Sequence, residues 1–160
     1  VPFGFWLHPF SGFLCIGFSG LADSLDGMVA RSRQEGSRYG AFLDSSLDRI
    51  SDSLYLLGFW VLFRESSFFI PASVGIFIGL ILTLLISYSK ARAESLGGKC
   101  SAGLLERDLR VVYLLIWSLI LSFAPRAEAV VLWTGLILYL LLTMMTVVQR
   151  MRHIRTILTD

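Results

Sequence analysis

Four aspartates lie close together along the chain, in two pairs whose spacing suits metal-assisted chemistry. Asp23 and Asp26 are three residues apart and Asp44 and Asp48 are four apart, so each pair shares one face of a helix. Converging carboxylates repel one another unless cations neutralise them. Hard oxygen ligands suit Mg²⁺ or Mn²⁺, which usually bridge a few carboxylates to substrate phosphates. The four aspartates therefore predict two divalent metal ions and a substrate that carries phosphate.

Small residues and one cation accompany the aspartates. Gly27 follows the first pair and lets a nucleotide or another backbone approach closely, and Ala30 leaves the same helical side open for a bulky ligand. Arg31 supplies a positive charge beside the metals, and Gly40 makes room one turn before the second pair. A competing interpretation is that each aspartate only solvates a helix end, which is the usual role of a single surface charge.

The complete spacing is more specific than any single aspartate. It resembles the signature of the CDP-alcohol phosphotransferase (CDP-alcohol phosphatidyltransferase) family at eight fixed positions over 26 residues. These positions are Asp23, Asp26, Gly27, Ala30, Arg31, Gly40, Asp44 and Asp48. So many constrained positions in one short segment outweigh the solvation interpretation.

The resemblance implies a reaction and a role for each aspartate. Members of the family move a phosphoalcohol from a cytidine diphosphate donor to an acceptor hydroxyl and release CMP. By this resemblance Asp23, Asp26 and Asp44 hold two metal ions, while Asp48 completes the carboxylate set and is the general base. Direct displacement is the expected route, because no Cys or Ser stands beside a base and both histidines lie far from the acidic segment. The implied cytidine and pyrophosphate pocket consists of Asp23, Gly27, Ala30, Arg31, Ser37 and Gly40.

Basic residues form a second cluster later in the chain. Its members are Lys90, Arg107, Arg110 and Arg150. Guanidinium groups bind phosphate through paired hydrogen bonds, so the cluster suits an anionic acceptor. The strings at 87–94 and 106–110 are similar to the branch of the family that makes phosphatidylinositol phosphate from CDP-diacylglycerol and inositol phosphate. That similarity implies inositol phosphate as the acceptor, bound by Lys90, Arg110 and Arg150.

Arg107 has two possible roles, because it can join the acceptor pocket or pair with the neighbouring Glu106, as Arg92 can with Glu94. Each basic residue taken alone is also explained by anchoring to anionic headgroups. The acceptor likewise has alternatives. A phosphatidylglycerophosphate synthase would use glycerol 3-phosphate, and a CDP-inositol-dependent enzyme would make di-inositol phosphate. A divalent-metal transporter is the rival from another class, but its carboxylates would lie near the bilayer midplane.

These residues must be positioned by apolar elements, since 55% of the chain is hydrophobic and its mean hydropathy is +0.70. Five apolar stretches stand out between polar segments: 8–22, 50–63, 67–89, 111–124 and 127–148. Two of them exceed the ~20 residues that cross a bilayer, and the other three gain length from their polar flanks. The sequence predicts an all-α, polytopic helical membrane bundle with five spanning helices.

Charge orients this bundle. Of the 14 Lys and Arg residues, all but Arg64 and Arg126 fall on one side when the five stretches alternate in direction. The positive-inside rule makes that side cytoplasmic, so we expect the active site to face the cytoplasm at a prokaryotic cell membrane. The same placement explains the net charge of +2 without nucleic acid as a partner.

Further expectations concern the whole assembly. The family has six spanning helices, and this chain opens with Val1, so we expect one domain over 1–160 that lacks its first helix. The resemblance implies a homodimer. Gly75 and Gly79, four residues apart, suit close contact between helices. Cys15 and Cys100 are too separate for a disulfide framework and are expected to be free thiols.

Overall fold

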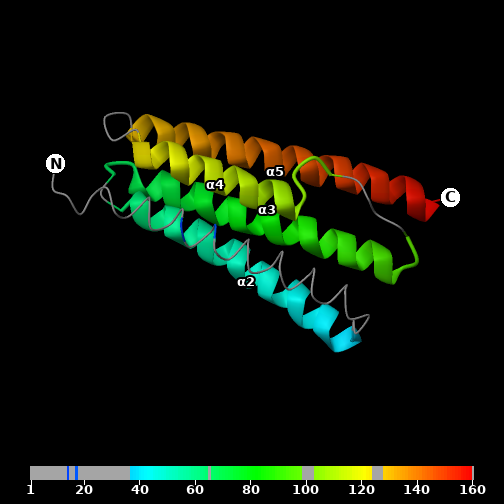
Figure 1. Ribbon diagram of the computed structural model, residues 1–160. Helices are drawn as coiled ribbons and strands as arrows, with labels where there is room; N and C mark the ends of the chain where they lie inside the picture. Colours follow the sequence, from blue (N-terminus) through cyan, green and yellow to red (C-terminus); the bar gives the residue numbers. More distant parts are fainter. Residues whose placement is uncertain are drawn as a thin grey trace.

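The computed structural model describes Leu14, Gly17 and the ranges 37–64, 66–98, 103–123 and 128–159. Four helices account for most of these residues: α2 (Arg38–Leu62), α3 (Phe69–Ser95), α4 (Arg107–Phe123) and α5 (Glu128–Thr159) (Figure 1). The described ranges contain no strand, which confirms the all-helical prediction for this part of the chain. The apolar stretch predicted at 8–22 lies almost entirely outside the described residues.

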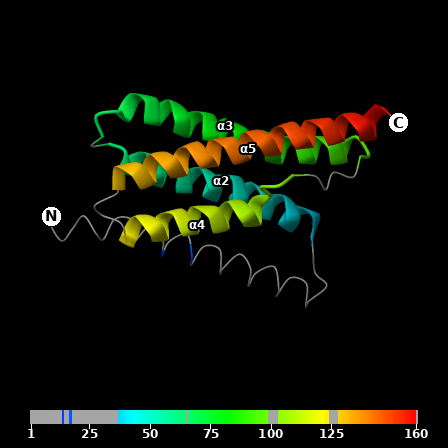
Figure 2. The same cartoon turned by 90° about the horizontal axis from the view of Figure 1, so that it is seen from above.

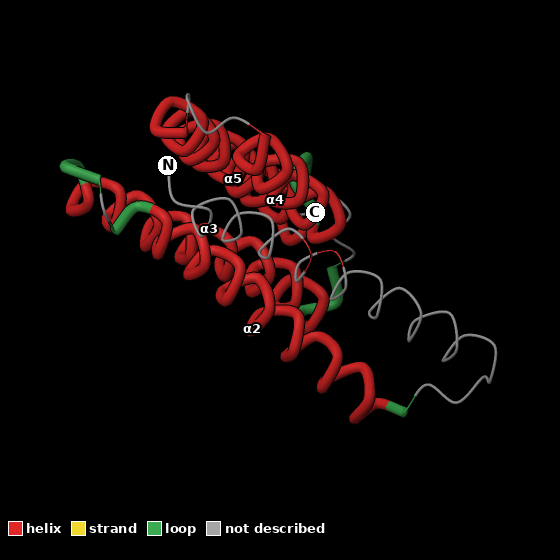
Figure 3. Tube along the Cα trace, turned by 60° about the vertical axis from the view of Figure 1, so that its left-hand side comes forward, coloured by secondary structure: helices red, strands yellow, loops and turns green. Residues whose placement is uncertain are grey.

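The helices run side by side along a common direction. Helix α3 packs along α5, α2 packs against α3, and α4 packs against α5 (Figures 1 and 2). The N-terminal part of α2 leads away from the bundle, as the tube in Figure 3 makes plain. This arrangement places Asp48 and Asp52 of α2 against Arg107 and Arg110 at the start of α4.

Helix α2 begins in polar sequence before its apolar part. The Ser37 hydroxyl accepts a hydrogen bond of 2.9 Å from the backbone N–H of Gly40, which caps the helix. The helix then continues for 25 residues through the aspartates and into the apolar run that ends at Leu62. The expectation that the second apolar stretch starts in its polar flank is therefore confirmed. The acidic residues lie on a regular helix rather than in a loop.

Glycines permit the close approach of α3 and α5. A Cβ atom at Gly75 would lie 3.0 Å from Leu136 Cδ2, and one at Gly79 would lie 3.2 Å from Tyr139 Cε1. Next to this contact, the hydroxyls of Thr83 and Tyr139 lie 2.7 Å apart and join the same two helices. The predicted close contact at the glycines is therefore made within the chain.

Helix α4 is held by an aromatic contact. The Trp117 ring stacks on Phe59 with centroids 3.9 Å apart, and its indole N–H donates to the Val131 carbonyl over 3.0 Å. Gly135 on α5 faces this ring so closely that a Cβ atom there would lie 2.1 Å from Trp117 Nε1. The apolar core thus fixes α4 against both α2 and α5.

Two of the described helices, α3 and α5, are long and apolar enough to cross a membrane. Large apolar side chains such as Ile70, Phe77, Ile81 and Leu141 are exposed along them, as in a helix that faces lipid. The fold is compatible with a helical membrane bundle. Both helices extend beyond the predicted stretches, α3 to Ser95 and α5 to Thr159, so they carry polar residues past the apolar core.

Candidate active site

An acidic stripe runs along α2. Asp44, Asp48 and Asp52 succeed one another at intervals of four residues and therefore share one helix face. Burial increases along the stripe: Asp44 is exposed, the Asp48 side chain is 13% exposed, and Asp52 is 4% exposed. One end of the stripe is open to a ligand, and the other end is part of the packed interior.

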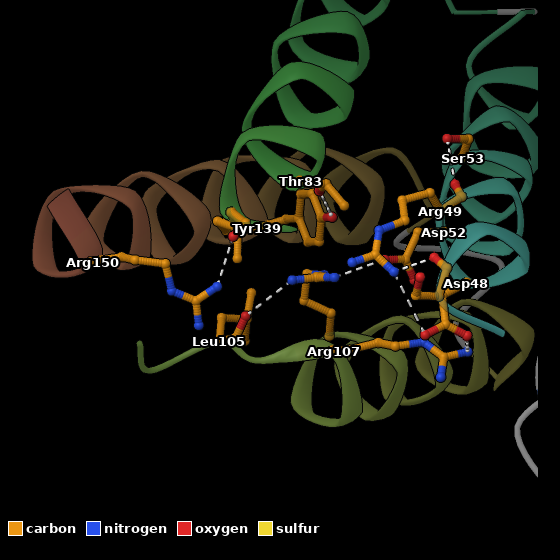
Figure 4. Close-up of polar contacts among 12 residues, drawn as sticks. Asp48, Arg49, Asp52, Ser53, Thr83, Leu105, Arg107, Tyr139 and Arg150 are labelled. Carbon is orange, nitrogen blue, oxygen red and sulfur yellow. Dashed lines mark hydrogen bonds and ion pairs between the residues drawn. The ribbon is translucent and has the colours of Figure 1, made fainter. Parts of the chain in front are cut away.

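Asp48, the predicted base, contacts the basic cluster directly. Its Oδ1 atom lies 2.7 Å from Nη2 of Arg107 on the first turn of α4 (Figure 4). Nη1 of the neighbouring Arg49 lies 3.9 Å from Asp48 Oδ2. Because all three side chains remain partly exposed, this end of the stripe can exchange an ionic partner for a metal ion or a substrate group.

A second ion pair lies one turn deeper. Arg110 Nη2 donates to Asp52 Oδ2 over 2.7 Å, and Arg110 Nη1 donates to the Leu105 carbonyl over 3.3 Å. Both charged side chains of this pair are almost fully buried. Removing one member of such a buried pair strongly destabilises a protein, because the other charge is left without a partner. The predicted acceptor residue Arg110 is therefore rigidly held.

Asp52 is a residue that the sequence interpretation missed. It lies outside the signature, although its position four residues after Asp48 on the same face was a signal that could have identified it. Among the described residues, Asp52 Oδ1 and Arg110 Nε are buried without a hydrogen-bond partner. Such atoms are costly in a dry interior, so the Asp52–Arg110 pair suits a place that receives another polar group.

Arg150 occupies the other side of the cluster, on α5. Its Nη1 atom donates to the Ile86 carbonyl over 2.7 Å, and Nη2 lies 3.5 Å from Glu106 Oε1 (Figure 4). Lys90, also predicted to bind the acceptor, follows Ile86 by one turn on α3 and is partly exposed. No hydrogen bond or ion pair joins Lys90 to another described residue. The ammonium group is thus available to a ligand at the level of Arg150.

The charge pairs that the sequence offered as one alternative, Arg107 with Glu106 and Arg92 with Glu94, differ from the contacts observed. Arg107 contacts Asp48, while its expected partner Glu106 contacts Arg150. The guanidinium of Arg92 lies 3.5 Å from the Ser95 hydroxyl. Arg107 therefore connects the acidic stripe to the basic cluster.

Of the residues predicted to bind the cytidine and pyrophosphate groups, Ser37 and Gly40 lie in the described part of the chain. Ser37 caps α2, and Gly40 lies so close that a Cβ atom there would be 3.0 Å from Ser37 Oγ. The remaining predicted residues Asp23, Asp26, Gly27, Ala30 and Arg31 lie outside the described residues. Within the described ranges, no group of three or more His, Cys, Asp or Glu side chains forms a metal cluster. Of the four predicted metal ligands, Asp44 and Asp48 lie in the described part of the chain.

Comparison with known proteins defines the class of this fold and site. The sequence profile of the CDP-alcohol phosphatidyltransferase family matches residues 1–150. The chain belongs to this family, and the resemblance drawn from the aspartate spacing is confirmed.

Two similar proteins, one bacterial and one archaeal, have related names. The chain is 35% identical over 153 residues to phosphatidylinositol phosphate synthase of Mycobacterium tuberculosis, an alignment that covers 92% of this chain and 68% of the relative. It is 38% identical over 112 residues to archaetidylinositol phosphate synthase of Methanothermobacter thermautotrophicus, covering 68% of this chain and 53% of the relative. The chain thus spans about half the length of the archaeal relative and about two thirds of the mycobacterial one.

Solved structures agree in fold. A crystal structure of the M. tuberculosis phosphatidylinositol phosphate synthase in complex with manganese and citrate has a TM-score of 0.79 at 33% identity, covering 95% of this chain and 73% of that one. A second structure of the same enzyme, with CDP-DAG bound, has a TM-score of 0.78 at 33% identity, covering 94% and 76%.

Proposed function

We propose that this protein transfers a phosphatidyl or related phosphoalcohol group from a CDP-lipid to a hydroxyl of inositol phosphate and releases CMP. The observation that carries the proposal is the 2.7 Å contact between Asp48 and Arg107, because it joins the signature carboxylates to the basic cluster. Reaction chemistry and acceptor recognition then meet between α2 and α4. The names of the mycobacterial and archaeal relatives support the same acceptor class.

The metal requirement fits the residues at the open end of the stripe. Asp44 is exposed and has no hydrogen-bond or ionic partner among the described residues, so its carboxylate is available to a cation. We assign two Mg²⁺ or Mn²⁺ ions to Asp44 and Asp48 together with Asp23 and Asp26. When bound, the metals neutralise the pyrophosphate and the charge that develops on the leaving CMP. The manganese in the related crystal structure supports this assignment.

Asp48 acts as the general base in this proposal. It accepts the proton of the acceptor hydroxyl as that oxygen attacks the lipid-bearing phosphorus, and the bond from phosphorus to the CMP oxygen breaks. Arg107, which pairs with Asp48 here, orients the carboxylate between reaction cycles. Transfer is a single displacement, so no group of the protein becomes phosphorylated.

Recognition of the acceptor falls to the basic cluster. Lys90, Arg110 and Arg150 bind the phosphate of inositol phosphate, and Arg107 lies between this phosphate and the base. We place the enzyme in a prokaryotic cell membrane with the site facing the cytoplasm, since the basic residues gather at that end of the helices. A homodimer is proposed from the family resemblance alone.

Release of CMP by the purified full-length protein tests the proposal. We expect release with CDP-diacylglycerol, Mg²⁺ and inositol phosphate, and loss of at least about a hundredfold in Asp48→Asn. Arg64→Gln serves as a control, because Arg64 is an exposed charge at the opposite end of α2. Release with glycerol 3-phosphate alone would keep the mechanism and replace the acceptor. Trapping a phosphorylated protein on denaturation would contradict direct displacement.

A further inference from the structure

The segment Gly103–Glu106, which leads into α4, touches both predicted acceptor arginines. The Leu105 carbonyl accepts a hydrogen bond of 3.3 Å from Arg110, and Glu106 Oε1 lies 3.5 Å from Nη2 of Arg150. These arginines come from different helices, α4 and α5. One short segment therefore contacts both guanidinium groups, through the Leu105 carbonyl and the Glu106 side chain.

The segment is itself tied to α5. The Leu105 N–H donates to the Thr146 hydroxyl over 3.0 Å, and the Leu104 N–H donates to Gln149 Oε1 over 3.3 Å. Leu105 is buried in the main apolar core, and Thr146 is fully buried. A buried hydrogen bond of this kind fixes its partners, because breaking it leaves a buried polar group unsatisfied.

Gly103 is required by the same arrangement. Its φ angle of +145° belongs to a region that L side chains rarely adopt. A Cβ atom there would lie 3.0 Å from Arg150 Nη2 and 3.1 Å from Thr146 Cγ2. The absence of a side chain thus lets the backbone pass directly over the Arg150 guanidinium.

We propose that the Gly103–Glu106 segment is a positioning element that sets the separation of the Arg110 and Arg150 guanidinium groups for one acceptor phosphate, and that Thr146 is its positioning residue. The proposal rests on the proposed function. An arginine loses considerable rotamer freedom when it binds a phosphate, so holding it beforehand increases affinity. A guanidinium has five N–H donors, enough for such holding contacts as well as a ligand.

Thr143 provides a matched control on the same helix. Both threonines are fully buried, and both donate to a carbonyl of α5, Thr143 to Tyr139 over 2.8 Å and Thr146 to Leu142 over 2.8 Å. Only Thr146 also accepts a hydrogen bond from the segment. Replacing either threonine by valine removes the Oγ1 hydroxyl and its hydrogen bond to α5. Only the Thr146 variant also loses the hydrogen bond from Leu105.

Steady-state kinetics of the full-length enzyme test this role. We expect Thr146→Val to raise the KM for inositol phosphate by about tenfold and to change the KM for CDP-diacylglycerol by less than about twofold. Thr146→Ser restores most of the affinity, because it keeps the hydroxyl. Gly103→Ala should show the same division between the two substrates, whereas Thr143→Val should leave both KM values at wild-type levels.

The outcomes distinguish this inference from the proposed function. Equal effects of Thr146→Val and Thr143→Val, or equal changes in both KM values, would overturn the positioning role. A wild-type enzyme that uses glycerol 3-phosphate instead would overturn the proposed acceptor. The same KM comparison, made with glycerol 3-phosphate, would then still decide the role of Thr146. Melting temperatures of the variants, measured in the same detergent, establish that each one folds.

Discussion

Asp52 on α2 and Arg110 on α4 form a 2.7 Å ion pair between side chains that are almost completely buried. Removing one charge leaves the other unpaired in the interior, whereas removing both leaves an apolar contact. The pair therefore offers a test that separates its effect on stability from its effect on activity.

We predict that Asp52→Leu lowers the free energy of unfolding by about 3 kcal/mol. The double variant Asp52→Leu with Arg110→Met should recover most of this loss and remain inactive, because Arg110 is a proposed acceptor ligand. Denaturation in detergent and CMP release measure the two effects. If the double variant were as unstable as Asp52→Leu, an unpaired Arg110 charge would not be the cause of the instability.

The packing of α4 on α5 gives a second prediction. Gly135→Ala should destabilise the protein by roughly 1–3 kcal/mol, since overpacking in a close-packed contact costs about that much. The reason is the 2.1 Å approach of a Cβ atom at this position to Trp117 Nε1. Gly58→Ala on α2 is the control, because a Cβ atom there meets nothing within 4 Å. If both variants unfold at the same denaturant concentration, the contact does not determine stability.

Lys90 gives a prediction on substrate affinity. Lys90→Ala should raise the KM for inositol phosphate by roughly tenfold and leave the KM for CDP-diacylglycerol unchanged, because a charge-assisted contact to phosphate contributes on the order of 1.5 kcal/mol. Arg92→Ala is the matched control, since Arg92 is an exposed cation on the same helix. Similar KM values in the two variants would mean that Lys90 only contributes general positive charge.

Metal removal tests the open end of the acidic stripe. Chelation should abolish CMP release, and Mg²⁺ or Mn²⁺ should restore it. Asp44→Asn should raise the metal concentration needed for half-maximal activity by at least about tenfold, because it removes a charged ligand. Asp108→Asn provides the comparison, since Asp108 is an exposed carboxylate at the start of α4. An unchanged metal requirement in Asp44→Asn would remove Asp44 from the metal set.

Sequence reasoning worked where function depends on residue type and spacing within one element. The family follows from the aspartate and glycine spacing, and the close contact at Gly75 and Gly79 follows from a spacing of four on a helix. It was less informative where two distant segments meet. Asp52 continues the four-residue spacing of Asp44 and Asp48, but its role becomes evident only when Arg110 is placed opposite it. Thr146 becomes noticeable only when the backbone of Leu105 is found beside its hydroxyl, because a threonine in an apolar helix is otherwise ordinary.

The length of α5 has a consequence for where the reaction can occur. Arg150 follows Glu128, the first residue of the helix, by 22 positions, which corresponds to ~33 Å of helix. A bilayer has a hydrocarbon layer of about 30 Å. In the proposed orientation, the length of α5 therefore places Arg150 at the level of the lipid headgroups on the cytoplasmic side. At that depth a CDP-lipid whose acyl chains remain in the bilayer can react with an acceptor that remains in aqueous solution.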